Sequence, residues 1–365
     1  MVVLENQTRK EGMTMNMKLL EDLVDVQGVA GYEDLVQQVV TKELLDCCDE
    51  VNEDRMGNII GLKRATGAVD GERPLRVMIC AHCDECGFMV RDVTDAGYVR
   101  LRGFGGPNNQ SIIGQQIRIA GTETVCGVMV PTAQDLTTFP KIEDLLVHTG
   151  RDVEWVRKRV RVGDRATVDI SLSQFNDTII TGRNFDDRLG VFCMIEAIKA
   201  LKMTDVGVDI YVVSSVQEEL GTRGAMVAAN AIKPDVGIAL DGGCIECPTY
   251  GKKDGWTSKI GGGAAIYQAD GLTVCSNSLN RFLEGLAKRE NIPCHDNWHG
   301  GTDAHQMQKQ GNGAYVTTIG VPTGYMHWPY ALADLRDVQA VIDLLRVFLV
   351  EAHTMGVSIN PWRKL

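Results

Sequence analysis

The sequence predicts an α/β fold that is interrupted by a small β-rich insertion. In most of the chain, short apolar runs typical of buried strands alternate with longer segments of helical periodicity, which is the pattern of a sheet with helices on both faces. Between residues 89 and 177 the pattern changes to short β-like pieces separated by Gly, Pro and Asn. We therefore expect one α/β domain in two parts, residues 1–88 and 178–365, around an inserted domain of residues 89–177.

The first part is predicted to contain two helices and a central strand. A helical pattern begins at residue 17 and ends at Gly28, because glycine readily adopts the conformation that follows a helix. Glu33 opens a second helix. The apolar run Val77–Cys80 is short, as expected for a buried strand, and it leads directly into the polar motif Ala81-His82-Cys83-Asp84-Glu85.

The insertion is expected to form a small, partly barrel-like β module. Its β-like pieces are FMVRDV, GYVRLRGF, QQIRIAG, VCGVMVP and DRATVDIS. The stretch IEDLLVHTGRDVEWVRKR within it has room for one short helix. The basic residues from Arg157 to Arg165 alternate with apolar ones, which favours one exposed strand face for that segment.

After Thr178 strands and helices alternate again. Three strand-like runs, IITG, VDIYVVSSV and PDVGIALD, each lead into a polar cluster, and AYVTTIG is a further strand. Helices are predicted at VFCMIEAIKALK, AMVAANAI, SLNRFLEGLAKRE and DLRDVQAVIDLLRVFLVEAHTM.

Net charge, apolar runs and cysteine content indicate which partners and which compartment to expect. The formal net charge of −11 argues against a nucleic-acid partner, since binding to a phosphate backbone usually needs a basic surface. The sequence has neither a run of roughly 18 apolar residues that would span a bilayer nor an apolar signal segment at its N-terminus. The 11 cysteines are an odd number, and several lie inside apolar runs, which indicates reduced thiols. We therefore expect a cytoplasmic protein with no nucleic-acid or membrane partner.

Five polar clusters at or near the ends of strand-like runs are candidate metal-binding positions: His82 with Asp84, Asp186–Asp187, Glu218–Glu219, Asp241 and His327. Each one alone has an ordinary explanation, such as a hydrogen-bonded core histidine, an acidic helix N-terminus or a solvated loop. Together they are more informative, because ligands of open α/β sheets gather at the carboxyl ends of the strands. A mixed set of imidazoles and carboxylates suits Zn²⁺, Co²⁺ or Mn²⁺. Asp84 is placed to accept the second ring N–H of His82, and the adjacent pair Glu218 and Glu219 suggests one ligand and one proton carrier.

The motifs AHCDECGFMV, GRNFDDRLG, QEELGTRGA, GIALDGG, GGTDAHQ and VPTGYMH, in this order, resemble those of the tetrahedral (TET) dodecameric metallo-aminopeptidases. These enzymes are close to deblocking and glutamyl aminopeptidases and to proteins formerly labelled endoglucanases. The resemblance implies a zinc-peptidase-like α/β/α catalytic domain, with the insertion as a dimerisation domain, and a homo-oligomer that is a dodecamer built from dimers. It also implies two divalent metal ions per subunit, Zn²⁺ first and Co²⁺ or Mn²⁺ as alternatives, and the removal of N-terminal residues from short peptides with a free N-terminus.

The resemblance also implies a role for each site residue. His82 and Asp241 would bind one ion, Glu219 and His327 the other, and Asp186 would bridge both. Glu218 would be the general base and acid, Asp84 would orient His82, and the peptide between Asp186 and Asp187 would be cis. Two metal ions would lower the pKa of a shared water, whose proton Glu218 would take.

Several residues near these motifs need separate interpretation. Gly324 and Trp328 stand where the family has Arg and Ser, and a glutamate expected a few residues later is absent, which leaves the substrate preference open. Cys80, Cys83 and Cys86 flank His82. We interpret them as buried free thiols rather than a thiolate cluster, because strand alternation points Cys80 and Cys83 to different sides. Asp303 is expected to support the site, whereas His295 and His299 are expected at the surface or an interface.

Other functions are compatible with the same residues. A related amidohydrolase acting on N-acyl amino acids would use the same metal ligands. A non-catalytic oligomeric binding protein is suggested by the altered loop around His327. A glycosidase is least favoured, because the adjacent pair Glu218 and Glu219 is better suited to metal chemistry than to flanking a sugar.

Overall fold

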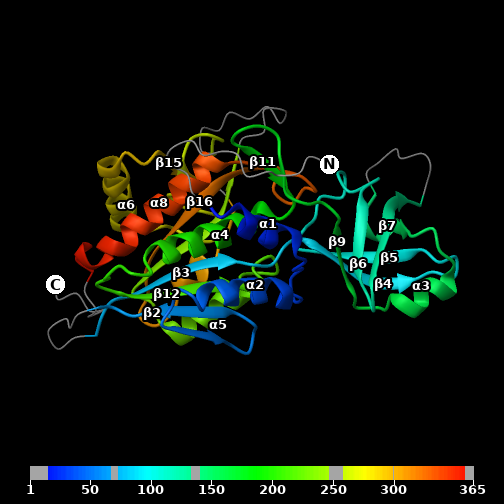
Figure 1. Cartoon of the computed structure of the whole chain (residues 1–365), viewed down its shortest axis with the longest axis horizontal. Coiled ribbons are helices and arrows are strands. Elements are labelled where there is room, and N and C mark those ends of the chain that lie inside the picture. The colour runs from blue at the N-terminus through cyan, green and yellow to red at the C-terminus, as the bar shows by residue number, and fades with distance from the viewer. Residues whose placement is uncertain (1–14, 67–72, 133–139, 246–257, 299, 358–365) are drawn as a thin grey trace.

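The computed structural model describes residues 15–66, 73–132, 140–245, 258–298 and 300–357. The chain folds into a large α/β unit and a closed β-barrel that lie side by side (Figure 1). The α/β fold class expected from the sequence is confirmed.

Within the described residues, eleven strands form one mixed sheet, in the order β1-β2-β12-β3-β13-β16-β17-β11-β10, with β14 paired to β16 and β15 paired to β14. Its four central strands, β12, β3, β13 and β16, are parallel, so their carboxyl ends meet at one edge. The strands are β1 (Glu50–Glu53), β2 (Ile59–Lys63), β3 (Arg76–His82), β10 (Ser173–Gln174), β11 (Ile179–Gly182), β12 (Asp209–Ser215), β13 (Val236–Cys244), β14 (Ala264–Tyr267), β15 (Cys294–Asn297), β16 (Tyr315–Gly324) and β17 (Ala331–Asp334). The pair β14 and β15 was not predicted.

Helices cover both faces of this sheet. The larger apolar core packs on one face beneath α1 (Met17–Asp25), α2 (Asp34–Leu44), α4 (Phe185–Ala200), α6 (Asn277–Glu290) and α8 (Leu335–Glu351). A smaller core on the other face lies beneath α5 (Arg223–Ile232) and α7 (Ala304–Met307). Strand alternation sends Cys80 to the smaller core and Ile79 to the larger one, as the period of two in a strand requires.

The barrel closes in the order β4-β5-β8-β7-β6-β9 and has its own apolar core. Closure leaves no open sheet edge. Its strands are β4 (Gly87–Val93), β5 (Val99–Phe104), β6 (Gln116–Ala120), β7 (Thr124–Pro131), β8 (Leu145–His148) and β9 (Arg165–Val168). Short 3₁₀ helices at Ile142–Asp144 and Ala352–Thr354 lie in the barrel and after α8.

One prediction for the barrel is wrong. Residues 157–159 are the last turn of helix α3 (Val153–Arg159), and do not belong to an exposed strand that runs to Arg165. The helix begins because Asp152 caps it, accepting a 2.8 Å hydrogen bond from the backbone N–H of Trp155. Val156 is its buried anchor.

Side-chain hydrogen bonds hold the barrel against the α/β unit. Gln27 donates to the carbonyl of Arg118 at 3.0 Å and to the hydroxyl of Thr167 at 2.8 Å. Arg118 in turn donates to the carbonyl of Asp25 at 2.9 Å. Near the carboxyl edge of the sheet, the N–H of Asn108 donates to the carbonyl of His327 at 3.0 Å, so a barrel loop lies beside that residue. In the described part of the chain, no helix has the length and apolar character needed to cross a membrane.

Candidate active site

The candidate residues meet at the carboxyl edge of the parallel strands. His82 ends β3, and the strand register places it level with Ser215, the last residue of β12. Ala239 of β13 pairs with Cys80 of β3, so Asp241 and His82, each two residues further on, lie at the same level. Glu218 and Glu219 follow β12, and His327 lies in the loop between β16 and β17. Parallel strands thus gather residues that are far apart in the sequence.

Two groups of potential ligand atoms share this edge. His82, Asp186 and Asp241 form one group, and Cys86, Glu219 and His327 form the other, with the ligand atoms of each group within 4.8 Å of one another. Asp186 lies between them, because its Oδ1 is 3.0 Å from His82 Nε2 and its Oδ2 is 3.3 Å from His327 Nε2. The peptide between Asp186 and Asp187 is cis, as the family resemblance implied.

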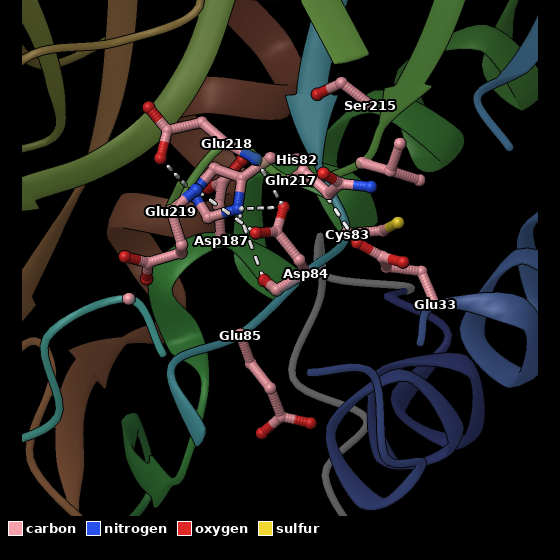
Figure 2. Close-up of polar contacts among 12 residues, drawn as sticks. Glu33, His82, Cys83, Asp84, Glu85, Asp187, Ser215, Gln217, Glu218 and Glu219 are labelled. Atoms are coloured by element: carbon pink, nitrogen blue, oxygen red, sulfur yellow. Dashed lines mark hydrogen bonds and ion pairs between the residues drawn. The ribbon is translucent and has the colours of Figure 1, made fainter. Parts of the chain in front are cut away.

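Asp84 supports both sides of the edge. Its carboxylate accepts the backbone N–H of Glu218 at 2.9 Å and that of Glu219 at 3.1 Å, and it lies 3.4 Å from His82 Nδ1 (Figure 2). Figure 2 shows that the two glutamates project to different sides, with Glu218 beside the imidazole of His82 and Glu219 away from it. The Glu218 carboxylate is 4.0 Å from His82 Nε2. One buried aspartate therefore orients a histidine and positions two adjacent glutamates.

Backbone in the left-handed region is concentrated here. Asn184, Gln217 and His327 have φ values of 51°, 55° and 63°, and each is a candidate ligand or lies within two residues of one. Such backbone costs a side-chain-bearing residue about 1–3 kcal/mol, and it is typically found where function requires a fixed geometry.

The buried carboxylates repel one another in the absence of a cation. Burial raises the pKa of Glu218 and of Asp241 well above the ordinary value, and it raises that of Glu219 to about 7, in each case with help from neighbouring acids. Asp186 is different, since hydrogen bonds from His327 and His82 outweigh its burial and hold its pKa below the usual range. Burial opposes protonation of His327, but Asp186 and Glu219 raise its pKa to about 9.

This arrangement fits divalent cations. Several buried carboxylates converge on two imidazoles, and no lysine or arginine makes a salt bridge with Asp186, Glu218, Glu219 or Asp241 among the described residues. Buried negative charges of this density need a compensating positive charge. Mixed imidazole and carboxylate donors are those preferred by zinc and related ions.

Sequence reasoning missed two supporting features. Glu85 is buried in an ion-pair network, with its carboxylate 3.0 Å from Arg183 and 3.4 Å from Arg188. Gly105, directly after β5, has a φ of +75°, and a Cβ there would lie 3.0 Å from both Glu219 Oε2 and Cys86 Sγ. A motif could have revealed Glu85, which lies in the AHCDEC run, but Gly105 gave no signal.

The other residues singled out in the sequence, Asp303 with the nearby cysteines and histidines, lie in different surroundings. Asp303 is buried and its Oδ2 accepts from Ser215 at 2.5 Å and from Cys80 at 3.3 Å, so it contacts the two strands that carry His82 and precede Glu218. Cys83 is buried in the larger core. Cys86, in contrast, is part of the site and is only partly buried. His295 is half-buried, and His299 lies outside the described residues.

A small cavity opens beside the second ligand group. Trp328 lines it, while the ring of Tyr325 lies 5.9 Å from that of Trp328. Apart from the candidate ligands, its charged lining consists of Glu85 and Arg183, which pair with each other. The apolar walls are Phe88, Pro107, Ile112, Val168, Phe185, Met326, Trp328, Pro329 and Ala331.

Comparison with known families shows which family of enzymes this chain matches. Residues 57–344 match the M42 glutamyl aminopeptidase family. The chain belongs to this family. It is therefore a metallo-aminopeptidase, a hydrolase that acts on peptide bonds.

Relatives of this M42 chain align with it over nearly the whole length of both partners. It is 31% identical over 362 residues to the lysyl aminopeptidase of Pyrococcus furiosus, an alignment that covers 94% of this chain and 99% of the relative. Among solved structures, an aminopeptidase of Desulfurococcus kamchatkensis has a TM-score of 0.87 at 27% identity, with 94% of this chain and 98% of the other covered. The TET1 peptidase of Pyrococcus horikoshii, which can assemble into a tetrahedron or a large octahedral shell, has a TM-score of 0.82 at 26% identity, with coverage of 92% and 99%.

Proposed function

We propose that this M42 enzyme is a dinuclear aminopeptidase that removes N-terminal residues from short peptides with a free N-terminus. His82 and Asp241 would hold one divalent ion, Glu219 and His327 the other, and Asp186 would contribute to both. The observation that carries this proposal is the position of Asp186, whose two carboxylate oxygens face the two histidines at 3.0 and 3.3 Å. Zn²⁺ suits these donors best, and Co²⁺ or Mn²⁺ are alternatives.

When bound, the two ions would supply Lewis acidity for the attacking water and the scissile carbonyl. The protein contributes the proton carrier, Glu218, whose carboxylate lies 4.0 Å from Nε2 of His82 in the first ligand group and whose backbone N–H is held by Asp84. Glu218 accepts the proton of the attacking water and returns it to the leaving amine. Without bound ions, burial raises the pKa of Glu218 above that of an exposed glutamate.

The cavity supports a preference for apolar first residues. Its walls are aromatic and aliphatic, and its one additional ion pair among the described residues, Glu85 with Arg183, is already satisfied. A charged substrate side chain would lose its hydration there without gaining a partner. An apolar preference would differ from the names of two similar groups of enzymes. One relative is called a lysyl aminopeptidase, and the family is called glutamyl aminopeptidase.

We further propose that the enzyme acts in the cytosol as a dodecamer built from dimers. The ten described cysteines are all free, which suits a reducing compartment. The tetrahedral assembly of the Pyrococcus horikoshii peptidase is the basis for the oligomer.

A mixed pool of free peptides, N-acetylated peptides and N-acyl amino acids tests the proposal directly. The protein is incubated with the pool and Zn²⁺, Co²⁺ or Mn²⁺, and products are followed by mass spectrometry. Successive single-residue losses from free-amine peptides alone, fastest for apolar first residues, are expected. Release of acyl groups from N-acyl amino acids would instead favour the amidohydrolase, and no turnover by folded, metal-loaded protein would favour the binding protein.

The first prediction concerns Glu218→Gln. This change keeps the shape of the side chain but removes its ability to accept a proton, so kcat should fall about 10²- to 10⁴-fold. Metal content, measured by elemental analysis, should be unchanged, because Glu218 is not a proposed ligand. Glu154→Gln on the exposed face of α3 is the control and should leave kcat unchanged. Full activity in Glu218→Gln would contradict the assignment.

A further inference from the structure

Cys86 occupies a position that neither the proposed ligand set nor the proposed proton carrier uses. It lies between the end of β3 and the start of β4, four residues after His82, and it is only partly buried. Its Sγ is 3.1 Å from Glu219 Oε1 and 2.8 Å from the carbonyl oxygen of Gly105. The side chain therefore faces the second ligand group rather than an apolar core, unlike Cys80 and Cys83.

The spacing of the three atoms matches that of ligands around one ion. Glu219 Oε1 is 3.1 Å from Cys86 Sγ and 3.5 Å from His327 Nε2, and all three lie within 4.8 Å of one another. Tetrahedral zinc with a Zn–S bond of about 2.3 Å and Zn–N or Zn–O bonds of about 2.0–2.1 Å places its ligand atoms about 3.3–3.6 Å apart. Small side-chain movements would bring the group to that geometry.

The single thiol proton of Cys86 can serve only one of the two oxygens that its sulfur contacts. A thiol carries one proton and can donate it to one acceptor, yet two oxygens lie within reach of this sulfur. Gly105 allows this crowding, because a Cβ at that position would lie 3.0 Å from Cys86 Sγ and from Glu219 Oε2. The sulfur is thus held against two oxygens, and the thiol proton can be donated to only one of them.

We propose that Cys86 Sγ is a ligand of the metal ion held by Glu219 and His327. This inference rests on the metal site of the proposed function. The thiol would release its proton to solvent on binding, and a thiolate would complete four protein donors with Asp186, Glu219 and His327. Because thiolates are soft ligands, this half of the site would favour Zn²⁺ over Mn²⁺.

Zinc K-edge X-ray absorption of the full-length, zinc-loaded protein tests the proposal. The wild type should show a sulfur scatterer at about 2.3 Å from zinc. The variants Cys86→Ser and Cys86→Ala should lack it, while retaining the folded circular dichroism spectrum. Cys126→Ser, which removes an exposed thiol on β7 of the barrel, is the matched control and should keep the sulfur signal.

Cobalt provides a second readout. The Co²⁺-loaded wild type and Cys126→Ser should show a near-ultraviolet sulfur-to-cobalt charge-transfer band that both Cys86 variants lack. Two bound ions with only nitrogen and oxygen neighbours in the wild type would overturn the role of Cys86 and leave the proposed function intact. A sulfur signal that persists in Cys86→Ser would overturn it as well. Failure of the wild type to bind any ion would overturn both proposals.

Discussion

At the scale of single residues, Asp84 makes contacts that link several parts of the candidate site. It is fully buried, and its two oxygens accept backbone N–H groups of Glu218 and Glu219 while one of them also faces His82 Nδ1. A carboxylate can accept at both oxygens, whereas an amide offers one acceptor and one donor. The position therefore requires a carboxylate and not merely a side chain of that shape.

This leads to a prediction for Asp84→Asn. The amide NH₂ would face one of the two backbone N–H groups, which would displace the Glu218–Glu219 backbone. It would also remove the carboxylate that faces His82 Nδ1 at 3.4 Å and leave that nitrogen the backbone carbonyl of residue 84 at 3.2 Å. Zn²⁺ affinity should fall about 10- to 100-fold, as measured by competition with a chelator. Asp92→Asn on the exposed side of β4 is the control. Unchanged affinity in Asp84→Asn would show that the aspartate does not support the metal ligands.

Sequence patterns found the residues that follow strands, because a buried apolar run ending in a polar cluster is visible locally. His82, Glu218, Glu219 and Asp241 belong to this class, and the structure brings them together at one sheet edge. From the sequence we predict only a buried thiol at Cys86. The contact of Cys86 with Glu219 could not be predicted, because the two residues are 133 positions apart in the chain. Such contacts depend on how the barrel sits against the sheet, and no local pattern records that arrangement.

At the scale of elements, the turn after β5 connects the barrel to the site. Gly105 adopts a φ of +75°, and Gly106, at +80°, would place a Cβ 3.8 Å from His327 Nδ1. The next residues continue this contact, since the N–H of Asn108 donates to the carbonyl of His327. The barrel therefore shapes the site of the α/β unit as well as lying beside it.

Gly105→Ala should lower activity and weaken metal binding, because its Cβ would lie 3.0 Å from Glu219 Cβ and Oε2. Gly114→Ala is a matched control, since Gly114 also lies in the barrel domain with a φ of +81°, but a Cβ added there would meet no atom within 4 Å. Both changes should cost about 1–3 kcal/mol of stability for the left-handed backbone. Steady-state kinetics should separate them, with kcat reduced only in Gly105→Ala. Equal kcat values for the two variants would show that the close approach of residue 105 to Glu219 does not matter for activity.

A second element-scale prediction concerns the ion-pair network beneath the site. Glu85, at the end of the His82 motif, pairs with Arg183 and Arg188 and also accepts the N–H of Gly28 at 2.9 Å, so it joins β3, α4 and the loop after α1. Glu85→Gln leaves two buried guanidinium groups uncompensated and should reduce the free energy of unfolding by about 3–5 kcal/mol.

Urea denaturation of the zinc-loaded protein measures this effect. The control is Glu284→Gln, which removes the partner of Arg281 in an exposed pair on α6 at 2.7 Å. Since exposed ion pairs contribute about 0–1 kcal/mol, the urea midpoint of the Glu284→Gln variant should barely change. Equal shifts in the two variants would show that the buried network contributes no more than a surface pair.

Secondary structure could be predicted from the sequence where a regular apolar pattern extends over a long segment. The helices α4, α6 and α8 and the strands β3, β12 and β13 match predicted segments. The strand predicted from Arg157 to Arg165 is wrong, because a short helix followed by a loop gives the same alternation of charged and apolar residues as a strand. The cap by Asp152 and the burial of Val156, which decide for a helix, act over only a few residues.

At the scale of the whole molecule, the barrel stands at one end of the chain's fold (Figure 1) and presents exposed apolar side chains. Val162, after α3, is 73% exposed, and Val128 on β7 is 43% exposed. Single exposed apolar side chains are common on protein surfaces and do not by themselves mark an interface. The proposal that the barrel makes the dimer contact of the dodecamer therefore rests on the family resemblance, and Val162 is the barrel residue chosen to test it.

Native mass and point substitutions test that proposal. Sedimentation equilibrium of the wild type should give twelve times the 40.0 kDa chain mass. Val162→Glu should reduce the mass, because a charged group at an apolar contact must be buried without a partner. Met203→Glu, at a position 92% exposed in the loop after α4, is the control and should leave the mass unchanged. A reduced mass for Met203→Glu alone would place the contact on the α/β unit, and an unchanged mass for both would remove Val162 from the interface.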